Sequence, residues 1–153
     1  MTIDRLIHFC VGVLFFYGFM KLNSLKIRHS VLLLGFIAMG LGTWISDWDL
    51  LLGIGFHRNP ITHSFLPALL VGWSVFKLKM PVFLIIGFSL GLSSHLFWDI
   101  IAFGNVHWVP GGNNDRIYLL FNSIILIVAA MQITNKFLKQ DTSGTSEAAP
   151  VEI

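Results

Sequence analysis

The chain has 153 residues, of which 55% are hydrophobic and 12% charged, with a formal net charge of +2. A soluble domain carries about twice that share of charged residues, so the composition argues against a soluble domain and predicts an integral membrane protein. The small net charge, without any Lys/Arg run, excludes a nucleic-acid-binding surface, and the lone Cys10 excludes a disulfide framework and a thiolate metal site.

Five apolar segments have nearly the length that an α-helix needs to cross a bilayer. They are residues 3–22, 31–45, 65–78, 81–103 and 117–134. We therefore expect an all-α fold, a polytopic membrane bundle of about five transmembrane helices in one domain, residues 1–138. Residues 139–153 are small and polar and include a proline, which predicts a disordered cytoplasmic tail.

The basic residues predict the orientation of the bundle. Seven of them follow the first, third and fifth segments: Lys21, Lys26, Arg28, Lys77, Lys79, Lys136 and Lys139. Only Arg5, Arg58 and Arg116 belong to the other side. Because cytoplasmic loops of membrane proteins are enriched in Lys and Arg, we expect the N-terminus outside and the C-terminus in the cytoplasm of a bacterial inner membrane.

The stretch between the second and third segments concentrates ionisable side chains. It carries Asp47, Asp49, His57, Arg58 and His63. The flanking segments are the shortest, since 15 helical residues cover only about 22 Å of a ~30 Å hydrocarbon core. The stretch is therefore predicted to dip into the outer leaflet, where such side chains are costly unless something binds them.

Seven His and Asp residues from separate parts of the chain are predicted to meet at the outer face. They are His8, Asp47, Asp49, His57, His63, His95 and Asp99. His95 and Asp99 are four residues apart and share one helical face. Mixed His and Asp ligation without cysteine predicts a divalent metal, Zn²⁺ in preference to Mn²⁺ or Fe, as one or two ions.

Each candidate also has a structural alternative. The two Asp residues could simply end a helix, His63 could precede a helix cap at Ser64, and His95 with Asp99 could form a hydrogen-bonded pair. A lone membrane histidine such as His8 often bonds between helices. Two acids so close together resist ionisation unless a cation is present, which favours metal binding.

Arg58 and His107 complete the set of candidates. Arg58 has no free lone pair, so it cannot bind a metal, but its guanidinium suits a phosphate or carboxylate group. The alternative for Arg58 is an interfacial side chain that reaches lipid headgroups. His107 lies on the same side, in a Gly/Asn-rich turn, and is an additional candidate.

Four features occur in an order that is similar to the YdjM-type family of membrane-bound metal-dependent hydrolases. They are His8 with Gly12, the Asp47-x-Asp49 pair, the block HRNPITHS from His57 and the block SHLFWD from Ser94. The resemblance covers residues 8–110, with departures at Ser46, Leu50, Asn59-Pro60 and Ala102 that leave the seven ligand positions intact. It implies that those seven positions hold metal and catalyse. Together with the argument for Arg58, this makes Asp49, His63 and Arg58 the expected catalytic residues.

The expected function is metal-dependent hydrolysis of a phosphoester or other ester of a lipid-like substrate, through metal-activated water at the outer face. Two alternatives are a transporter or proton pathway that uses the intramembrane His and Asp, and a non-catalytic protein whose helices are stapled by metal. The transporter is disfavoured because the inner halves of the segments offer few polar side chains, among them Ser74, Ser89 and Asn122.

Overall fold

The structure is a computed structural model and describes residues 3–25, 28–53, 57–107 and 113–137. These residues form five α-helices and one 3₁₀ helix. In chain order they are α1 (Ile3–Leu22), α2 (His29–Ile45), the 3₁₀ helix η1 (Ser46–Leu52), α3 (Leu66–Lys77), α4 (Phe83–Ala102) and α5 (Asn113–Phe137). The predicted all-α class is confirmed, whereas the predicted tail, residues 139–153, lies outside the described residues.

Within the described residues, four helical stretches are long and apolar enough to cross a membrane. They are Ile3–Leu22, His29–Leu52, Phe83–Ala102 and Asn113–Lys136. Their outward faces carry exposed apolar side chains such as Leu14 and Leu33, which suit contact with lipid. The helix α3 has 12 residues, about 18 Å at 1.5 Å per residue, and is shorter than the hydrocarbon core of a bilayer. A fifth crossing therefore stays a prediction.

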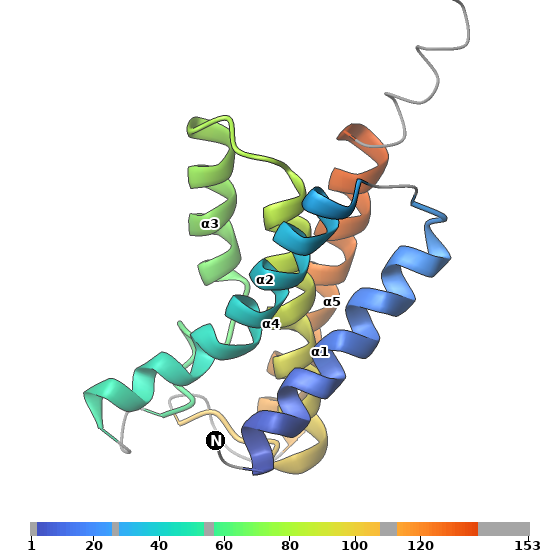
Figure 1. The fold of residues 1–153 in the computed structure, drawn as a ribbon. Coiled ribbons are helices and arrows are strands. Elements are labelled where there is room, and N and C mark those ends of the chain that lie inside the picture. Colours follow the sequence, from blue (N-terminus) through green and yellow to red (C-terminus); the bar gives the residue numbers. More distant parts are fainter. Residues whose placement is uncertain (1–2, 26–27, 54–56, 108–112, 138–153) are drawn as a thin grey trace, which may run out of the picture.

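The helix α4 is the centre of the bundle, and α1, α2, α3 and α5 all pack against it (Figure 1). The crossing with α2 is close because it is lined by glycines. A Cβ atom on Gly87 would meet the backbone of Gly35, and one on Gly91 would meet the backbone of Met39. Small residues at a membrane helix crossing let the two backbones approach and increase their van der Waals contact. The site residues of α4 are thus held on a rigid element.

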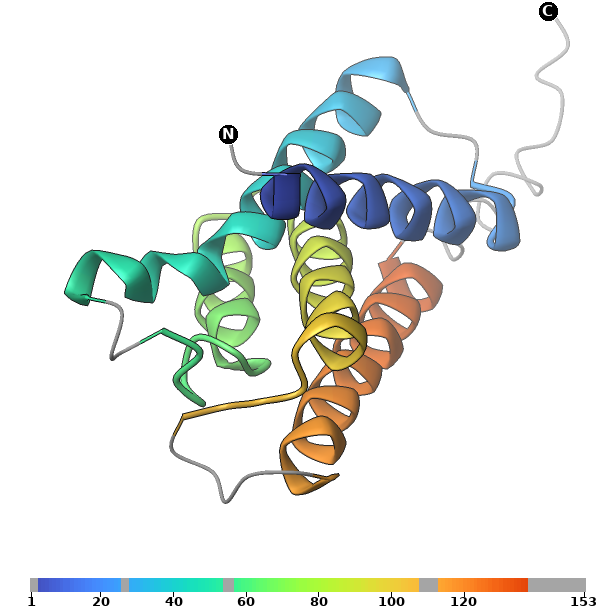
Figure 2. The ribbon, with the colours of Figure 1, turned by 90° about the horizontal axis from the view of Figure 1, so that it is seen from below.

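The change from α2 to η1 places the Asp pair. Helix α2 continues without a break into η1, which leads away from the bundle beside the start of α1 (Figure 2). Gly53 ends η1 with φ +107°, a conformation that favours glycine. Asp47 and Asp49 both lie in the first turn of η1, at the end of the molecule where α1 begins and α4 ends.

The segment before α3 is fastened to α5. The Tyr118 hydroxyl donates to the carbonyl of Pro60 at 2.6 Å, and the backbone N–H of Phe65 donates to the Asn122 side-chain oxygen at 3.0 Å. Figure 1 shows α3 beginning part-way up the bundle, above the lower ends of α1 and α4. Residues 57–64 can therefore turn inward toward α4.

Candidate metal centre

Asp99 is the hub of the site, and three imidazoles surround its carboxylate. The Nε2 atom of His8, from α1, lies 3.3 Å from Oδ1 of Asp99. The Nε2 atom of His95, one turn earlier on α4, lies 3.3 Å from Oδ2, and the Nε2 atom of His63 lies 3.4 Å from the same oxygen. All four residues are buried. Side chains from three separate parts of the chain thus meet at one point.

The outer nitrogens of two of these rings are fixed by backbone carbonyls. The Nδ1 atom of His8 lies 3.0 Å from the carbonyl oxygen of Asp4, and that of His95 lies 2.8 Å from the carbonyl oxygen of Thr43. A carbonyl only accepts, so Nδ1 must donate in both rings. In the neutral imidazoles the Nε2 lone pairs then face the Asp99 carboxylate, an arrangement that needs a proton or a cation between the two groups.

Three buried atoms at this point have no hydrogen-bond partner: Nε2 of His63, Nε2 of His95 and Oδ2 of Asp99. Leaving such atoms unsatisfied is costly, and a metal ion bound between His95 and Asp99 would satisfy two of them. Donors bound tetrahedrally to Zn²⁺ at about 2.0–2.1 Å lie about 3.3–3.4 Å apart, close to the separations around Asp99. His8, His95 and Asp99 each offer one ligand atom, all within 4.8 Å of one another, so this group could hold a metal ion.

The contacts around Asp99 form one lobe of the site, and Asp49 is the centre of a second lobe beside it. Its Oδ1 atom lies 3.0 Å from Nδ1 of His57, and its Oδ2 atom accepts from the Thr62 hydroxyl at 2.8 Å. The backbone and side-chain N–H groups of Asn59 also donate to Oδ2, at 3.3 and 3.4 Å. The carboxylate is fully buried. Asn59 and Thr62 thus hold the position of Asp49.

His63 joins the two lobes. Its Nδ1 atom lies 3.5 Å from Oδ2 of Asp49, whereas its Nε2 atom faces Asp99. His63 lies outside the four membrane-length helices, and burial lowers the pKa of its imidazole, although its contacts with Asp99 and the charge of Asp49 act in the opposite direction. A lowered pKa keeps the ring neutral, the form that binds metal.

Asp47 lies at the edge of the cluster. Its Oδ1 atom is 3.9 Å from Nε2 of His95, and its side chain is 15% exposed. The structure therefore brings all seven predicted ligand residues into one connected network, with Asp47 and His57 nearest to solvent. The backbone carbonyls of Asp4 and Thr43 and the side chains of Asn59 and Thr62 also shape it. Sequence reasoning missed Asp4 and Thr43 because no pattern marks a residue that acts through its carbonyl, and it did not predict that the side chains of Asn59 and Thr62 would bond to Asp49.

Arg58 and His107 lie beside the network. The guanidinium of Arg58 covers the Phe103 ring, 3.7 Å from its centre, and donates to the side chain of Asn105. No carboxylate among the described residues forms an ion pair with it. His107 donates its backbone N–H to the carbonyl of Arg58, but its exposed imidazole makes no contact with the network in the described part of the chain.

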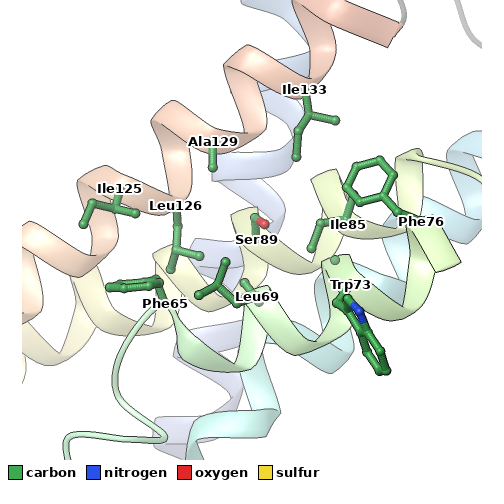
Figure 3. Close-up of a pocket in the computed structure, with 12 residues that line it drawn as sticks. Phe65, Leu69, Trp73, Phe76, Ile85, Ser89, Ile125, Leu126, Ala129 and Ile133 are labelled. Carbon is green, nitrogen blue, oxygen red and sulfur yellow. The ribbon is translucent and has the colours of Figure 1, made fainter.

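A separate groove of about 300 Å³ lies between α3 and α5, across α4 (Figure 3). Apolar side chains line it, among them Phe65, Leu69, Phe76 and Ile133, and the hydroxyl of Ser89 is there as well. The groove contains no ionisable side chain and offers no metal donor. It suits an acyl chain better than a reacting group.

No family model matches this chain, and no curated protein or solved structure matches it either. The function is therefore inferred from the geometry of the cluster.

Proposed function

We propose that this protein is a membrane-bound metal-dependent hydrolase that cleaves a phosphoester or other ester of a lipid-like substrate. The observation that supports this most directly is the group of buried atoms at Asp99. Three imidazole nitrogens converge on one carboxylate, and His63, His95 and Asp99 each leave an atom there without a hydrogen-bond partner. The likeness of the motifs to YdjM-type hydrolases points in the same direction.

His8, His63, His95 and Asp99 would hold the first ion, with Asp47 at its edge. Three imidazoles with one carboxylate favour Zn²⁺ over Mn²⁺ or Fe. The Asp49–His57 lobe offers donors for a second ion. A divalent ion held by these donors supplies Lewis acidity, which acidifies bound water and polarises a substrate ester.

The chain's own residues would handle protons and charge. Asp49 is buried and its Oδ2 atom is held by Thr62 and Asn59, so its Oδ1 atom is placed to accept a proton. His57 contacts Oδ1 and is partly exposed, which gives that proton a route to solvent. Arg58 is paired only with neutral groups among the described residues, so its charge is available to orient an anionic substrate.

The basic residues support a site on the outer face of a bacterial inner membrane. Lys21, Lys77 and Lys136 lie in the last turns of α1, α3 and α5, away from the cluster. The positive-inside bias places that end in the cytoplasm, with the N-terminus outside. If α3 and the segment before it together cross the bilayer, the chain makes five crossings.

The test is elemental analysis of the protein purified in mild detergent, followed by assays with p-nitrophenyl phosphodiesters and p-nitrophenyl butyrate. We expect about one or two equivalents of metal, hydrolysis that EDTA removes and Zn²⁺ restores, and loss of both metal and activity in Asp99→Asn. The matched control is Asp115→Asn, because Asp115 is also buried but lies on α5 outside the cluster. Metal-free protein from several growth conditions would remove the proposal. Bound metal without hydrolysis would favour the non-catalytic alternative.

A further inference from the structure

A cleft of about 500 Å³ opens beside the metal centre, between the start of α1 and the end of α2 with η1. Its lining consists of Arg5, Trp44, Asp47, Trp48, Leu50 and Leu51. We propose that this cleft binds the anionic headgroup of a membrane phospholipid and presents it to the metal centre. The inference rests on the proposed hydrolase function and specifies its substrate class.

Arg5 supplies the charge that would recognise the headgroup. Its side chain is exposed in the first turns of α1, and no described carboxylate lies within ion-pair distance of it. A guanidinium can bind two oxygens of a phosphate in parallel, and it is the side chain best matched to that geometry. Among the described residues that line the cleft, Arg5 is the only basic one.

The rest of the lining is suited to the apolar part of the same molecule. Trp44 and Trp48 are 46% and 58% exposed, and Leu51 is 85% exposed, although all three are large and apolar. Tryptophan is enriched at the level of lipid headgroups because its ring is apolar and its N–H is polar. A charged group between exposed apolar side chains matches an amphiphile better than a soluble anion.

Asp47 connects the cleft with the metal centre. It lines the cleft, and its Oδ1 atom lies 3.9 Å from the unpartnered Nε2 atom of His95. A headgroup bound by Arg5 would therefore lie beside the edge of the cluster where Asp47 and His95 meet. A cation at the cluster would offset the negative charge of Asp47 and remove its repulsion of a phosphate.

The experiment measures lipid binding by native mass spectrometry of the detergent-purified protein, with dioleoylphosphatidylglycerol and dioleoylphosphatidylcholine as probes. These lipids share acyl chains but differ in net charge. We expect the wild type to prefer phosphatidylglycerol, and Arg5→Gln to weaken its binding about tenfold, as for loss of one charged hydrogen-bonded contact. Arg28→Gln is the matched control, because it makes the same charge change before α2, at the other end of α1. Arg5→Lys should keep most of the preference.

Equal binding of the two lipids by the wild type, or an unchanged preference in Arg5→Gln, would overturn the proposal. Displacement of phosphatidylglycerol by an equal concentration of glycerol 3-phosphate would overturn it as well, because a soluble headgroup lacks the acyl chains. Metal content measured on the same samples separates the two proposals. Metal-free protein that loses its lipid preference in Arg5→Gln refutes the hydrolase and keeps the cleft. If the protein contains metal and Arg5→Gln binds both lipids like the wild type, the cleft proposal is refuted and the hydrolase proposal stands.

Discussion

Asp99→Asn should abolish the dependence of the protein's stability on divalent metal. Asp99 contacts all three converging imidazoles, so its replacement by a neutral amide removes the one anionic ligand that they share. Asparagine has nearly the same size as aspartate, so it can occupy the same buried position on α4. The change should therefore act on metal binding much more than on packing.

The magnitude follows from ligand linkage. A metal present at 100 times its dissociation constant stabilises the folded protein by about 2.7 kcal/mol. For a chain of this size, each kcal/mol corresponds to about 2–4 °C in the midpoint of thermal unfolding. EDTA should therefore lower the midpoint of the wild type by about 5–10 °C, and restored Zn²⁺ should recover it. The Asp99→Asn variant should unfold at one temperature with EDTA or with Zn²⁺.

The assay is thermal unfolding in detergent, followed by intrinsic tryptophan fluorescence in EDTA and then in excess Zn²⁺. Asp115→Asn is the control, and it should keep the full response to EDTA because Asp115 lies outside the cluster. In EDTA the Asp99→Asn variant should be no less stable than the wild type, since an amide N–H can donate to an imidazole lone pair that a carboxylate repels. An equal EDTA shift in Asp99→Asn and the wild type would show that any metal binds elsewhere.

Three further changes probe the surrounding structure. Thr62→Val removes the hydroxyl that donates to Asp49 and should lower the free energy of unfolding by about 1–2 kcal/mol in chemical denaturation, whereas Thr62→Ser should restore it. Gly91→Ala places a Cβ against the backbone of α2 and should cost about 1–3 kcal/mol in the same measurement, whereas Gly18→Ala, which meets nothing within 4 Å, should be neutral. Arg58→Gln should lower kcat/KM for an anionic phosphodiester about tenfold and leave that for a neutral ester unchanged, and equal losses on both substrates would contradict its role in anion recognition.

Much of the fold could be predicted because hydrophobic length is a strong signal. The predicted segment 3–22 coincides with α1, and 81–103 differs from α4 by two residues at the start and one at the end. The predicted segment 117–134 is shorter than α5, which begins at Asn113 and ends at Phe137. The first turn of α5 is polar, so hydrophobicity did not indicate where the helix begins. Capping was harder to predict. Ser64 does accept from the backbone N–H of Leu66, at 3.2 Å, but the N-cap residue of α3 is Phe65.

The residues that form the site could be predicted from the sequence, but the contacts between them could not. Ionisable side chains are rare in this chain, so the position of these His and Asp residues near the outer ends of the predicted membrane segments was enough to predict that they lie together. The sequence carried no sign that Asp47 and Asp49, two residues apart, would diverge toward His95 and His57. Their separation depends on the 3₁₀ geometry of η1, which a periodicity analysis does not distinguish from the end of α2.

The shortness of α3 explains how His63, which lies outside the membrane-length helices, becomes part of the metal centre. Helix α4 has 20 residues and α3 has 12, a difference of about 12 Å at 1.5 Å per residue. The chain before α3 covers that distance as a turn held to Asp49 and to α5, and it carries His63 to Asp99. If α3 were extended by two turns toward the N-terminus, this segment would be helical and would continue the axis of α3, antiparallel to α4. His63 could then no longer contact both Asp49 and Asp99, so the length of α3 determines whether the two lobes are joined.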